Sequence, residues 1–326
     1  MIPNYAQGCI APVFTAFHED GRLDDDGQRA ILDYLVETGA VSACFIRCGL
    51  GQLFVFSEED ARQIAKTACE HLAGKVPVLA GCMGIWDRNR DALPDPEVYR
   101  RQAVELSKYA QDLGAAGVVH TLPEALQPAA GQTCAEVVID YFEMVNDAVN
   151  VPIFIYQNPG TDERYCVDDD LVRALADIPN VAGMKLSNSN AAYIFDVTYA
   201  TRDKDFAFIV GAETAFLAGL ITGATACIGQ GATINPQIIR AVYDRYHAGD
   251  LAGAIKAQHS TNLLVNRSNN CVEFFKRWLA EKGYNVQPYA RSMKNNPYMG
   301  DRPPLSQEEY EAYKRLFEAE LEKYTR

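Results

Sequence analysis

The segments Pro-Ile-Phe-Ile-Tyr at residues 152–156 and Val-Pro-Val-Leu-Ala-Gly at residues 76–81 are apolar at nearly every position. A strand with one face in water alternates apolar and polar side chains. A strand that is buried on both faces, as in a parallel sheet covered by helices, is apolar throughout. The two segments therefore indicate strands of a parallel sheet.

Eight apolar segments of this kind follow one another along the chain. We predict strands at Cys9–Phe17, Ser42–Cys48, Val76–Cys82, Gly117–Leu122, Pro152–Asn158, Val181–Ser187, Phe206–Gly211 and Ala226–Gly231. Amphipathic helices are predicted between them, at residues 24–39, from the capping Ser57 onward, 97–114, 133–149, 168–177, 190–202, 213–222 and 236–248. Eight strand-then-helix units in a row predict the α/β class and a (β/α)₈ TIM barrel. The alternative is an open doubly wound sheet, which favours a Gly-rich phosphate turn after an early strand, and the sequence has none there.

The strand pattern stops after residue 249. Helical periodicity then covers residues 250–265, 269–283 and 305–325, whereas Asn295–Pro304 is expected to form a loop. Asp87–Pro96, rich in proline and charge, is expected to form an exposed loop after the third strand. We therefore predict a barrel domain at residues 1–249 and a C-terminal extension of three helices at residues 250–326.

Composition excludes several classes of function. The formal net charge of −13 repels phosphate backbones, so nucleic acid is not an expected partner. The nine cysteines form no CxxC motif and no Cys/His cluster, which favours buried reduced thiols over disulfides or zinc. The start of the chain lacks the pattern of a secretory signal, and no apolar run reaches the length of a membrane span. We expect a cytoplasmic protein that has no membrane partner.

Two polar side chains at the ends of neighbouring predicted strands are candidates for catalysis, because TIM barrels carry their functional residues at that end. Lys185 interrupts the apolar run Val-Ala-Gly-Met-Lys-Leu. Burial disfavours its ammonium form, so its amine can attack a carbonyl group; a lysine paired with a nearby carboxylate is an equal alternative. Tyr156 ends the preceding strand and can move protons beside that amine, although a tyrosine alone is more often part of a core.

The remaining candidate residues surround this pair. Gly49, Leu50 and Gly51 can form a nest of backbone N–H groups for a carboxylate, or simply a turn. Ser187, Glu213 and Gln230 can hydrogen-bond the hydroxyl groups of a substrate, but helix capping explains Glu213 and its neighbour Thr214 equally well. His120 and Glu213 are the next candidates for a proton carrier if Tyr156 is not one.

Several motifs together resemble the dihydrodipicolinate synthase / N-acetylneuraminate lyase superfamily over nearly the whole chain. The residues that carry the resemblance are the first strand at 8–17 with Asp20-Gly21 after it, Tyr156-Gln157-Asn158-Pro159, Gly183-Met184-Lys185, and Gly223-Ala224 with Ile228-Gly229. The last of these is closer to the lyase branch than to the synthase branch. The resemblance implies a TIM barrel with three additional helices, usually a tetramer, in which Lys185 forms a Schiff base and Tyr156 transfers protons. It implies neither a metal nor a cofactor.

The sequence departs from the family pattern at three places. The family's Gly-Thr/Ser-Thr-Gly-Glu loop is Cys48–Gln52 here, and both of its hydroxyl groups are absent. Ala125 stands where family members carry the second tyrosine of Pro-Tyr-Tyr, which reaches across a dimer interface. Thr161 stands where the synthase branch has an arginine. All three departures argue against dihydrodipicolinate synthesis.

We therefore interpret the chain as a Schiff-base lyase, an aldolase or a dehydratase. Its expected substrate is a pyruvate-derived 2-oxo acid or a 2-keto-3-deoxy sugar acid, and it is expected to be a homo-oligomer, a tetramer or a dimer. One alternative is 4-hydroxy-tetrahydrodipicolinate (dihydrodipicolinate) synthase. A second alternative is a catalytically silent protein that binds 2-oxo acids.

Overall fold

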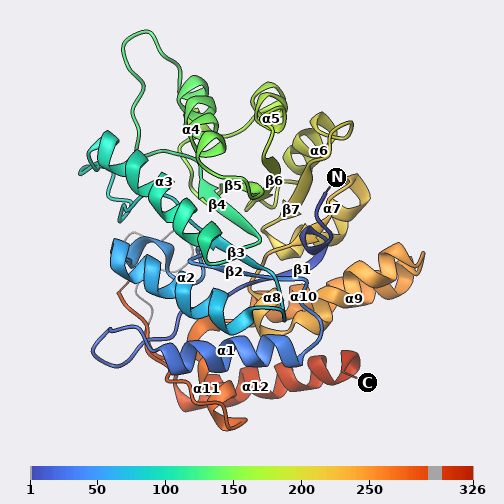
Figure 1. Cartoon of the computed structure of the whole chain (residues 1–326). Helices are drawn as coiled ribbons and strands as arrows, with labels where there is room; N and C mark the ends of the chain where they lie inside the picture. Colours follow the sequence, from blue (N-terminus) through green and yellow to red (C-terminus); the bar gives the residue numbers. More distant parts are fainter. Residues whose placement is uncertain (1, 293–302, 326) are drawn as a thin grey trace.

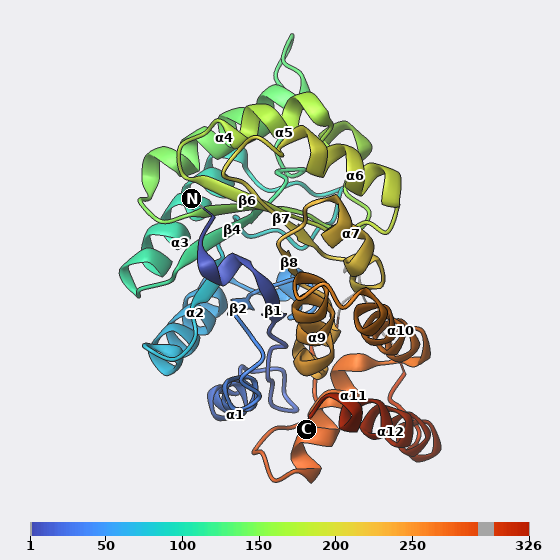
Figure 2. The ribbon, with the colours of Figure 1, turned by 90° about the vertical axis from the view of Figure 1, so that its right-hand side faces the viewer.

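The computed structural model describes residues 2–292 and 303–325, and it has the predicted (β/α)₈ barrel. The eight parallel strands are hydrogen-bonded in sequence order, and β1 pairs with both β2 and β8. Helices surround this sheet in both views (Figures 1 and 2). The alternative of an open sheet is therefore wrong, since an open sheet would leave one side of β1 or of β8 unpaired.

All eight predicted strands are present. Their bounds are β1 Gly8–Pro12, β2 Ala43–Ile46, β3 Val78–Gly81, β4 Gly117–Thr121, β5 Ile153–Gln157, β6 Val181–Leu186, β7 Ala207–Val210 and β8 Ala226–Cys227. β1 and β8 are shorter than predicted. After β8 the chain turns at once into a short helix, α8 (Gly231–Ile234), which is too short to produce a periodic sequence pattern.

The helices follow the strands in the expected alternation. They are α1 Asp25–Glu37, α2 Glu58–Leu72, α3 Pro96–Asp112, α4 Cys134–Ala148, α5 Asp169–Ala176, α6 Ala191–Ala200, α7 Phe216–Thr222 and α9 Pro236–His247. The predicted cap of α2 is confirmed, because Ser57 Oγ accepts the N–H of Asp60 at 3.1 Å and the Asp60 carboxylate accepts the N–H of Ser57. Such reciprocal caps satisfy N–H groups that have no partner within the helix.

Alternate residues of each strand point into the barrel and toward the helices. The inner layer is apolar and includes Ile10, Phe45, Leu79, Val119, Phe154 and Ile209, all at most 4% exposed. The outer layer, between strands and helices, is a larger apolar cluster. Polar groups in the inner layer are therefore surrounded by low-dielectric material, which sets the conditions for the site described below.

The C-terminal extension packs against α1, and its helix α11 makes the contact. It consists of α10 Leu251–Arg267, α11 Cys271–Glu281 and α12 Gln307–Leu321 (Figures 1 and 2). The ring of Tyr34 on α1 lies 5.3 Å from Phe275 and 5.8 Å from Trp278, measured between ring centroids. The division of the chain at residue 249 into two domains stays a prediction. Most of the predicted loop Asn295–Pro304 lies outside the described residues.

One buried lysine connects this extension to the barrel. Lys276 on α11 is fully buried, and its Nζ donates to the carbonyl oxygen of Thr15, just past β1, at 2.7 Å and to that of Tyr289 at 2.6 Å. Burial lowers the pKa of Lys276 to about 7, and the nearby charge of Asp24 raises it. The link to Thr15 therefore places α11 in direct contact with a segment at the mouth of the barrel.

Each of the nine cysteines is a free thiol in the structure, and seven of them are buried. Across residues 2–292 and 303–325, no helix has both the length and the apolar character that crossing a bilayer requires.

Replacing Leu79 with Ala should destabilise the fold strongly, because Leu79 is fully buried in the inner layer. Removal of a buried leucine costs about 2–5 kcal/mol through lost burial and the cavity that remains. The matched control is Leu93→Ala, since Leu93 is 39% exposed in the loop before α3, and it should change stability by about 0.5 kcal/mol or less. Urea unfolding of the two variants measures the difference. Equal stabilities would contradict the assignment of Leu79 to the inner core.

Candidate active site

Lys185 and Tyr156 lie side by side inside the barrel. β5 pairs with β6 so that Tyr156 is directly opposite Lys185, and the two residues are 1% and 3% exposed, Tyr156 being the more buried. Lys185 Nζ is 4.1 Å from the centroid of the Tyr156 ring and 5.6 Å from that of Phe45. The structure thus brings together the two residues that the sequence singled out. It does so at the carboxyl ends of the strands, where TIM-barrel sites are built.

The environment of Lys185 increases the fraction of its amine that is neutral. Burial lowers the pKa of Lys185 to about 8, while the charges of Cys48, Cys227 and Glu213 oppose that shift. An amine with this pKa is partly unprotonated near neutral pH, so it can attack a carbonyl carbon. The alternative, a structural ion pair, would hold the pKa near or above its usual range instead.

Tyr156 is a weak acid in this environment. Burial raises the pKa of the phenol well above its ordinary value, and the charge of Cys48 raises it further. A side-chain hydrogen bond with Ser187 and the positive charge of Arg88 lower it. The phenol is therefore protonated at neutral pH, and it has a hydroxyl partner on the neighbouring strand end with which it can exchange a proton.

Glu213 lies directly after the loop that follows β7, in the short 3-10 helix η4 (Glu213–Ala215), and it is buried. Its Oε1 accepts the N–H of Gly231 at 2.9 Å, so it caps the short helix α8. Its carboxylate also lies so close to Gly229 that a Cβ there would come within 1.4 Å of Oε2, and only glycine fits. Burial raises the pKa of Glu213 to about 7, although the backbone N–H groups of Gly231 and Gln230 and the charge of Lys185 lower it. Glu213 thus bonds the start of α8, whereas the helix that Glu213 and Thr214 begin has no side-chain cap.

Gln230 and Ser187 take different positions. Gln230 is not on a strand, because it occupies the N-cap position of α8, where it is half-buried. Ser187 directly follows β6, and its N–H donates to the carbonyl oxygen of Gln157 at 3.1 Å. Ser187 therefore lies beside Tyr156, with which it shares a side-chain hydrogen bond.

The loop Cys48–Gln52 is a tight turn built around the sulfur of Cys48. The N–H of Gly51 donates to Cys48 Sγ at 3.2 Å, and hydrogen bonds from the backbone of Gly51 and Leu50 lower the pKa of this thiol, which burial raises to about 11. Gly51 is required here, since a Cβ would lie 2.5 Å from the carbonyl oxygen of Val13. The backbone N–H groups do converge, and the sequence analysis missed that Cys48 Sγ lies at their focus.

Contacts from elsewhere hold this loop in place. Thr15 Oγ1 donates to the carbonyl oxygen of Gly51 at 2.7 Å, and Gln52 Nε2 donates to that of Arg291 at 2.6 Å. Arg291 in turn forms an ion pair with Asp60 on α2. Both the segment after the first strand and the C-terminal extension therefore position the loop.

Three further residues from the sequence analysis can be placed. Ala125 is buried, and Thr161 lies in the turn after β5, where its Oγ1 donates to the carbonyl oxygen of Asn158 at 3.0 Å. His120 points toward the helices, with Nε2 3.0 Å from Ser107 Oγ and Nδ1 2.8 Å from Tyr141 Oη. His120 was therefore a wrong choice as the next proton carrier, because alternation along β4 turns it away from the barrel interior.

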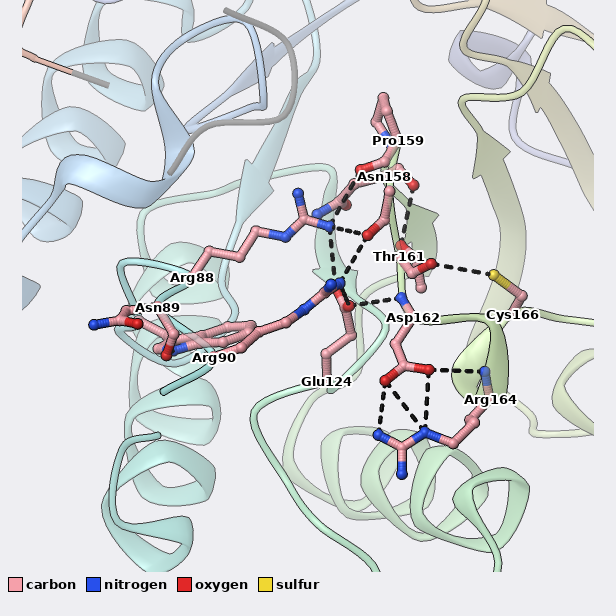
Figure 3. A network of polar contacts seen from close by, with 12 residues as sticks. Arg88, Asn89, Arg90, Glu124, Asn158, Pro159, Thr161, Asp162, Arg164 and Cys166 are labelled. Carbon is pink, nitrogen blue, oxygen red and sulfur yellow. Dashed lines mark hydrogen bonds and ion pairs between the residues drawn. The ribbon is translucent and has the colours of Figure 1, made fainter. Parts of the chain in front are cut away.

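A cluster of charged residues at the mouth was not predicted. Arg88 and Arg90, from the loop before α3, both reach the buried carboxylate of Glu124, which follows β4 (Figure 3). The N–H of Asp162, after β5, donates to the same carboxylate at 2.7 Å. The predicted exposure of Asp87–Pro96 holds for most of the loop but not for Arg88, whose side chain is only 7% exposed. Arginines in the loop after a barrel strand were the available sequence signal.

Within the part of the chain that the structure describes, no three His, Cys, Asp or Glu side chains are grouped so that they could hold a metal ion.

Comparison with known proteins gives a consistent result. The sequence model of the dihydrodipicolinate synthetase family matches residues 5–319. The chain is 28% identical over 261 residues to YagE of Escherichia coli K12, which is named as a provisional 2-dehydro-3-deoxy-D-gluconate aldolase; the match covers 79% of this chain and 80% of YagE. It is 29% identical over 248 residues to a 4-hydroxy-tetrahydrodipicolinate synthase of Nitrosospira multiformis, covering 76% of each chain.

Solved structures show the same fold. The crystal structure of YagE in complex with pyruvate superposes with a TM-score of 0.78 at 25% identity, covering 96% of this chain and 98% of YagE. N-acetylneuraminate lyase from Mycoplasma synoviae superposes with a TM-score of 0.76 at 22% identity, covering 99% of each chain. The resemblance seen in the sequence motifs is therefore confirmed.

The carboxyl group of Glu213 should make the protein less stable as pH rises from about 4.5 to about 7. The folded state holds this proton up to pH about 7, whereas the unfolded chain releases it near pH 4.5, so the stabilisation is complete at low pH and is lost as pH rises. At about 1.4 kcal/mol per pKa unit, the loss is on the order of 3 kcal/mol. The free energy of unfolding of Glu213→Gln, measured in urea across this pH range, should not show this loss.

The matched control is Glu19→Gln, in which an exposed carboxyl group is removed, and its curve should stay parallel to that of the wild type. Parallel curves for Glu213→Gln and the wild type would show that Glu213 is ionised in the folded protein throughout this range.

Proposed function

Since the chain belongs to the dihydrodipicolinate synthetase family, whose members are class I lyases, we propose that it cleaves or dehydrates a 2-oxo acid through a Schiff base on Lys185. The substrate class is a pyruvate-derived 2-oxo acid or a 2-keto-3-deoxy sugar acid. The observation that carries the proposal is the position of the Lys185 amine, which is buried inside the barrel next to Tyr156 and has a pKa of about 8.

The chemistry begins with the neutral amine of Lys185. It attacks the ketone carbon, and loss of water from the carbinolamine gives a protonated imine. In an aldolase, this cation accepts the electron pair of the bond between C3 and C4 as that bond breaks, so an aldehyde leaves and an enamine remains. Protonation of the enamine and hydrolysis of the imine then release pyruvate. In a dehydratase the same electron sink assists removal of the C3 proton and loss of a hydroxyl group as water.

Tyr156 is the proposed proton carrier in these steps. It can give a proton to the departing hydroxyl of the carbinolamine and take one from the substrate hydroxyl on C4. Its raised pKa keeps it protonated until a substrate group is ready to receive the proton, and its hydrogen bond with Ser187 offers a route for returning it. This arrangement supports a role for Ser187 in proton transfer as well as in binding the substrate tail.

The remaining residues are proposed to bind substrate. The turn at Gly49, Leu50 and Gly51 is the proposed site for the 2-oxo acid carboxylate, which would replace Cys48 Sγ as the acceptor of the N–H groups that converge there. Glu213 and Gln230 are proposed to contact hydroxyl groups of the tail from the loops that follow β7 and β8. Glu213 can do so as a hydrogen-bond donor, since its carboxyl group is protonated below pH about 7.

Two other functions compete with this proposal. The relationship to 4-hydroxy-tetrahydrodipicolinate synthases supports the synthase alternative, but the absence of hydroxyl groups at Gly49 and Leu50 and of an arginine at Thr161 argues against it. The alternative of a silent binding protein is opposed by the intact pair of Lys185 and Tyr156. The pyruvate complex of the related YagE supports pyruvate as the part of the substrate that is recognised at the lysine.

The quaternary structure and the location belong to the same proposal. A homo-oligomer, either a dimer or a tetramer, is supported by large apolar side chains on the surfaces of α6 and α7, where Phe195, Tyr199 and Ile221 are 49%, 52% and 63% exposed. A cytoplasmic location is supported by the nine free thiols, because oxidising compartments favour disulfides.

Borohydride reduction in the presence of pyruvate should attach pyruvate irreversibly to Lys185. Only the neutral amine reacts, so the rate of trapping should rise with pH through about 8 and then level off. Peptide mass spectrometry identifies the modified lysine, and a panel of other 2-oxo acids extends the test. The structure offers a matched control in Lys276, also buried with a lowered pKa but bound to two carbonyl oxygens. An adduct on Lys276 or elsewhere, or none with any 2-oxo acid, would show the mechanism to be wrong.

Replacing Tyr156 with Phe should lower turnover by about 10²–10⁴-fold, the usual contribution of a positioned acid or base. The ring and its packing remain, so stability should change by only about 1 kcal/mol. The melting temperature and the rate of pyruvate release from the substrate found in the panel measure the two effects. Turnover within a few-fold of the wild type would make Tyr156 a packing residue.

A separate assay tests the synthase alternative. Formation of the lysine-pathway product from pyruvate and aspartate semialdehyde by the wild type, at about 10 turnovers per second, would favour that alternative.

A further inference from the structure

Arg88 is a charged side chain buried at the mouth of the barrel. It lies in the loop between β3 and α3, and its side chain is 7% exposed. Its backbone is in the left-handed region, with φ of 62°, which a residue other than glycine rarely adopts. Its Nη2 donates to the carbonyl oxygens of Gly160 at 2.6 Å and Pro159 at 3.2 Å (Figure 3). A buried guanidinium is rare, and a strained backbone is typical of functional sites, so the two together indicate a functional role for Arg88.

The charges around Arg88 do not balance. Glu124 is the carboxylate shared by two arginines, and its stronger contact is with Arg90, at 2.6 Å compared with 3.5 Å for Arg88. The carboxylate of Asp162 is held by Arg164 at 2.7 Å. Three arginines thus share two carboxylates, so the cluster carries one excess positive charge in a chain whose net charge is −13. Of the three arginines, Arg88 has the longest ion pair.

Two buried atoms of this cluster have no hydrogen-bond partner among the described residues. They are Nε of Arg88, a donor, and Oδ1 of Asn158, an acceptor. A buried polar atom left unpaired costs about 1–3 kcal/mol, so these two atoms are able to accept a water, an ion or a ligand group as partner. The Nε–H of a guanidinium can donate a charge-assisted hydrogen bond to a carboxylate or phosphate oxygen, while Nη2 of Arg88 keeps its bonds to the two carbonyl groups.

The cluster is adjacent to the proposed reaction centre. Cζ of Arg88 lies 5.6 Å from the centroid of the Phe54 ring, and Phe54 belongs to the inner layer that contains Tyr156. The carbonyl groups that Arg88 holds follow Tyr156 by three and four residues, and Asn158 follows it by two. The positive charge of Arg88 also lowers the pKa of Tyr156. A substrate bonded to Lys185 would therefore extend its tail past Tyr156 toward this guanidinium.

We propose that Arg88 determines substrate specificity by binding an anionic group, a carboxylate or a phosphate ester, at the end of the substrate remote from its 2-oxo acid. Asn158 Oδ1 accepts a hydrogen bond from a hydroxyl group of the same tail. This inference rests on the proposed function and names its substrate class more closely: a 2-oxo acid or 2-keto-3-deoxy sugar acid with a second negative charge. Arg90 and Glu124 position Arg88 and do not contact the tail.

The test compares ligands of equal length with and without the second charge. The half-saturation concentration for borohydride trapping at Lys185 is measured for 2-oxoadipate and 2-oxohexanoate, and separately for 2-keto-3-deoxy-6-phosphogluconate and 2-keto-3-deoxygluconate. The wild type should prefer the charged member of one pair by about tenfold or more, as expected for a charge-assisted hydrogen bond. The pair that shows the preference distinguishes a carboxylate from a phosphate.

Substitution of Arg88 completes the test. In Arg88→Gln the ratio of the two half-saturation concentrations should fall to about one. Both concentrations are measured on the same variant, so any general effect of the substitution on imine formation cancels in the ratio. Arg88→Lys keeps the charge without the planar fork and should keep part of the preference. The matched control Arg164→Gln removes an exposed arginine of the same cluster and should keep all of it.

The outcomes separate the two proposals. Failure to trap pyruvate at Lys185 overturns the proposed function. Trapping of pyruvate with no preference for charge in the wild type, or a preference that survives in Arg88→Gln, overturns the role of Arg88 alone. If Arg88→Gln does not fold, Arg88→Lys takes its place. A preference in Arg88→Lys equal to that of the wild type would overturn the role of Arg88, and a reduced preference would support it.

Discussion

The chemistry proposed for the site depends on the burial of one amine in the closed barrel. The inner layer supplies apolar side chains around Lys185, and burial in this environment brings its pKa down to about 8. The parallel pairing of β5 with β6 then fixes Tyr156 opposite Lys185 without requiring either side chain to find the other. Glu213 experiences the same desolvation with the opposite sign, so one low-dielectric interior makes a base of the lysine and an acid of the glutamate near neutral pH.

The barrel could be predicted because its strands are buried on both faces, so each one appears as an uninterrupted apolar run. Lys185 was recognisable as the polar exception within such a run, and Tyr156 through its place at the end of the neighbouring strand. The cluster of Arg88 and Glu124 was not predictable in this way. Its members come from loops of separate strand–helix units and meet only when the barrel closes, so no local sequence pattern records their pairing.

The departures from the family pattern are concentrated at the mouth, whereas the framework that holds the lysine is retained. Hydroxyl groups are missing at Gly49 and Leu50, but the turn persists around the sulfur of Cys48. An arginine is missing at Thr161, but Arg88 approaches the adjacent Gly160 from another loop. This is the usual division of labour in TIM barrels, in which strands preserve the chemistry while the loops that follow them change its target.

The contacts of the Cys48–Gln52 loop have a consequence for the order in which the molecule is made. The loop belongs to the first sixth of the chain, yet Gln52 is bound by Arg291, and Thr15, which holds Gly51, is bound by Lys276. During synthesis from the amino terminus, these two supports are among the last to leave the ribosome. The nascent barrel therefore carries its lysine and tyrosine long before it can fix the loop beside them. A chain truncated before Lys276 would lack both contacts. Its Cys48–Gln52 loop would then be mobile, and the truncated protein would be a better substrate for cellular proteases.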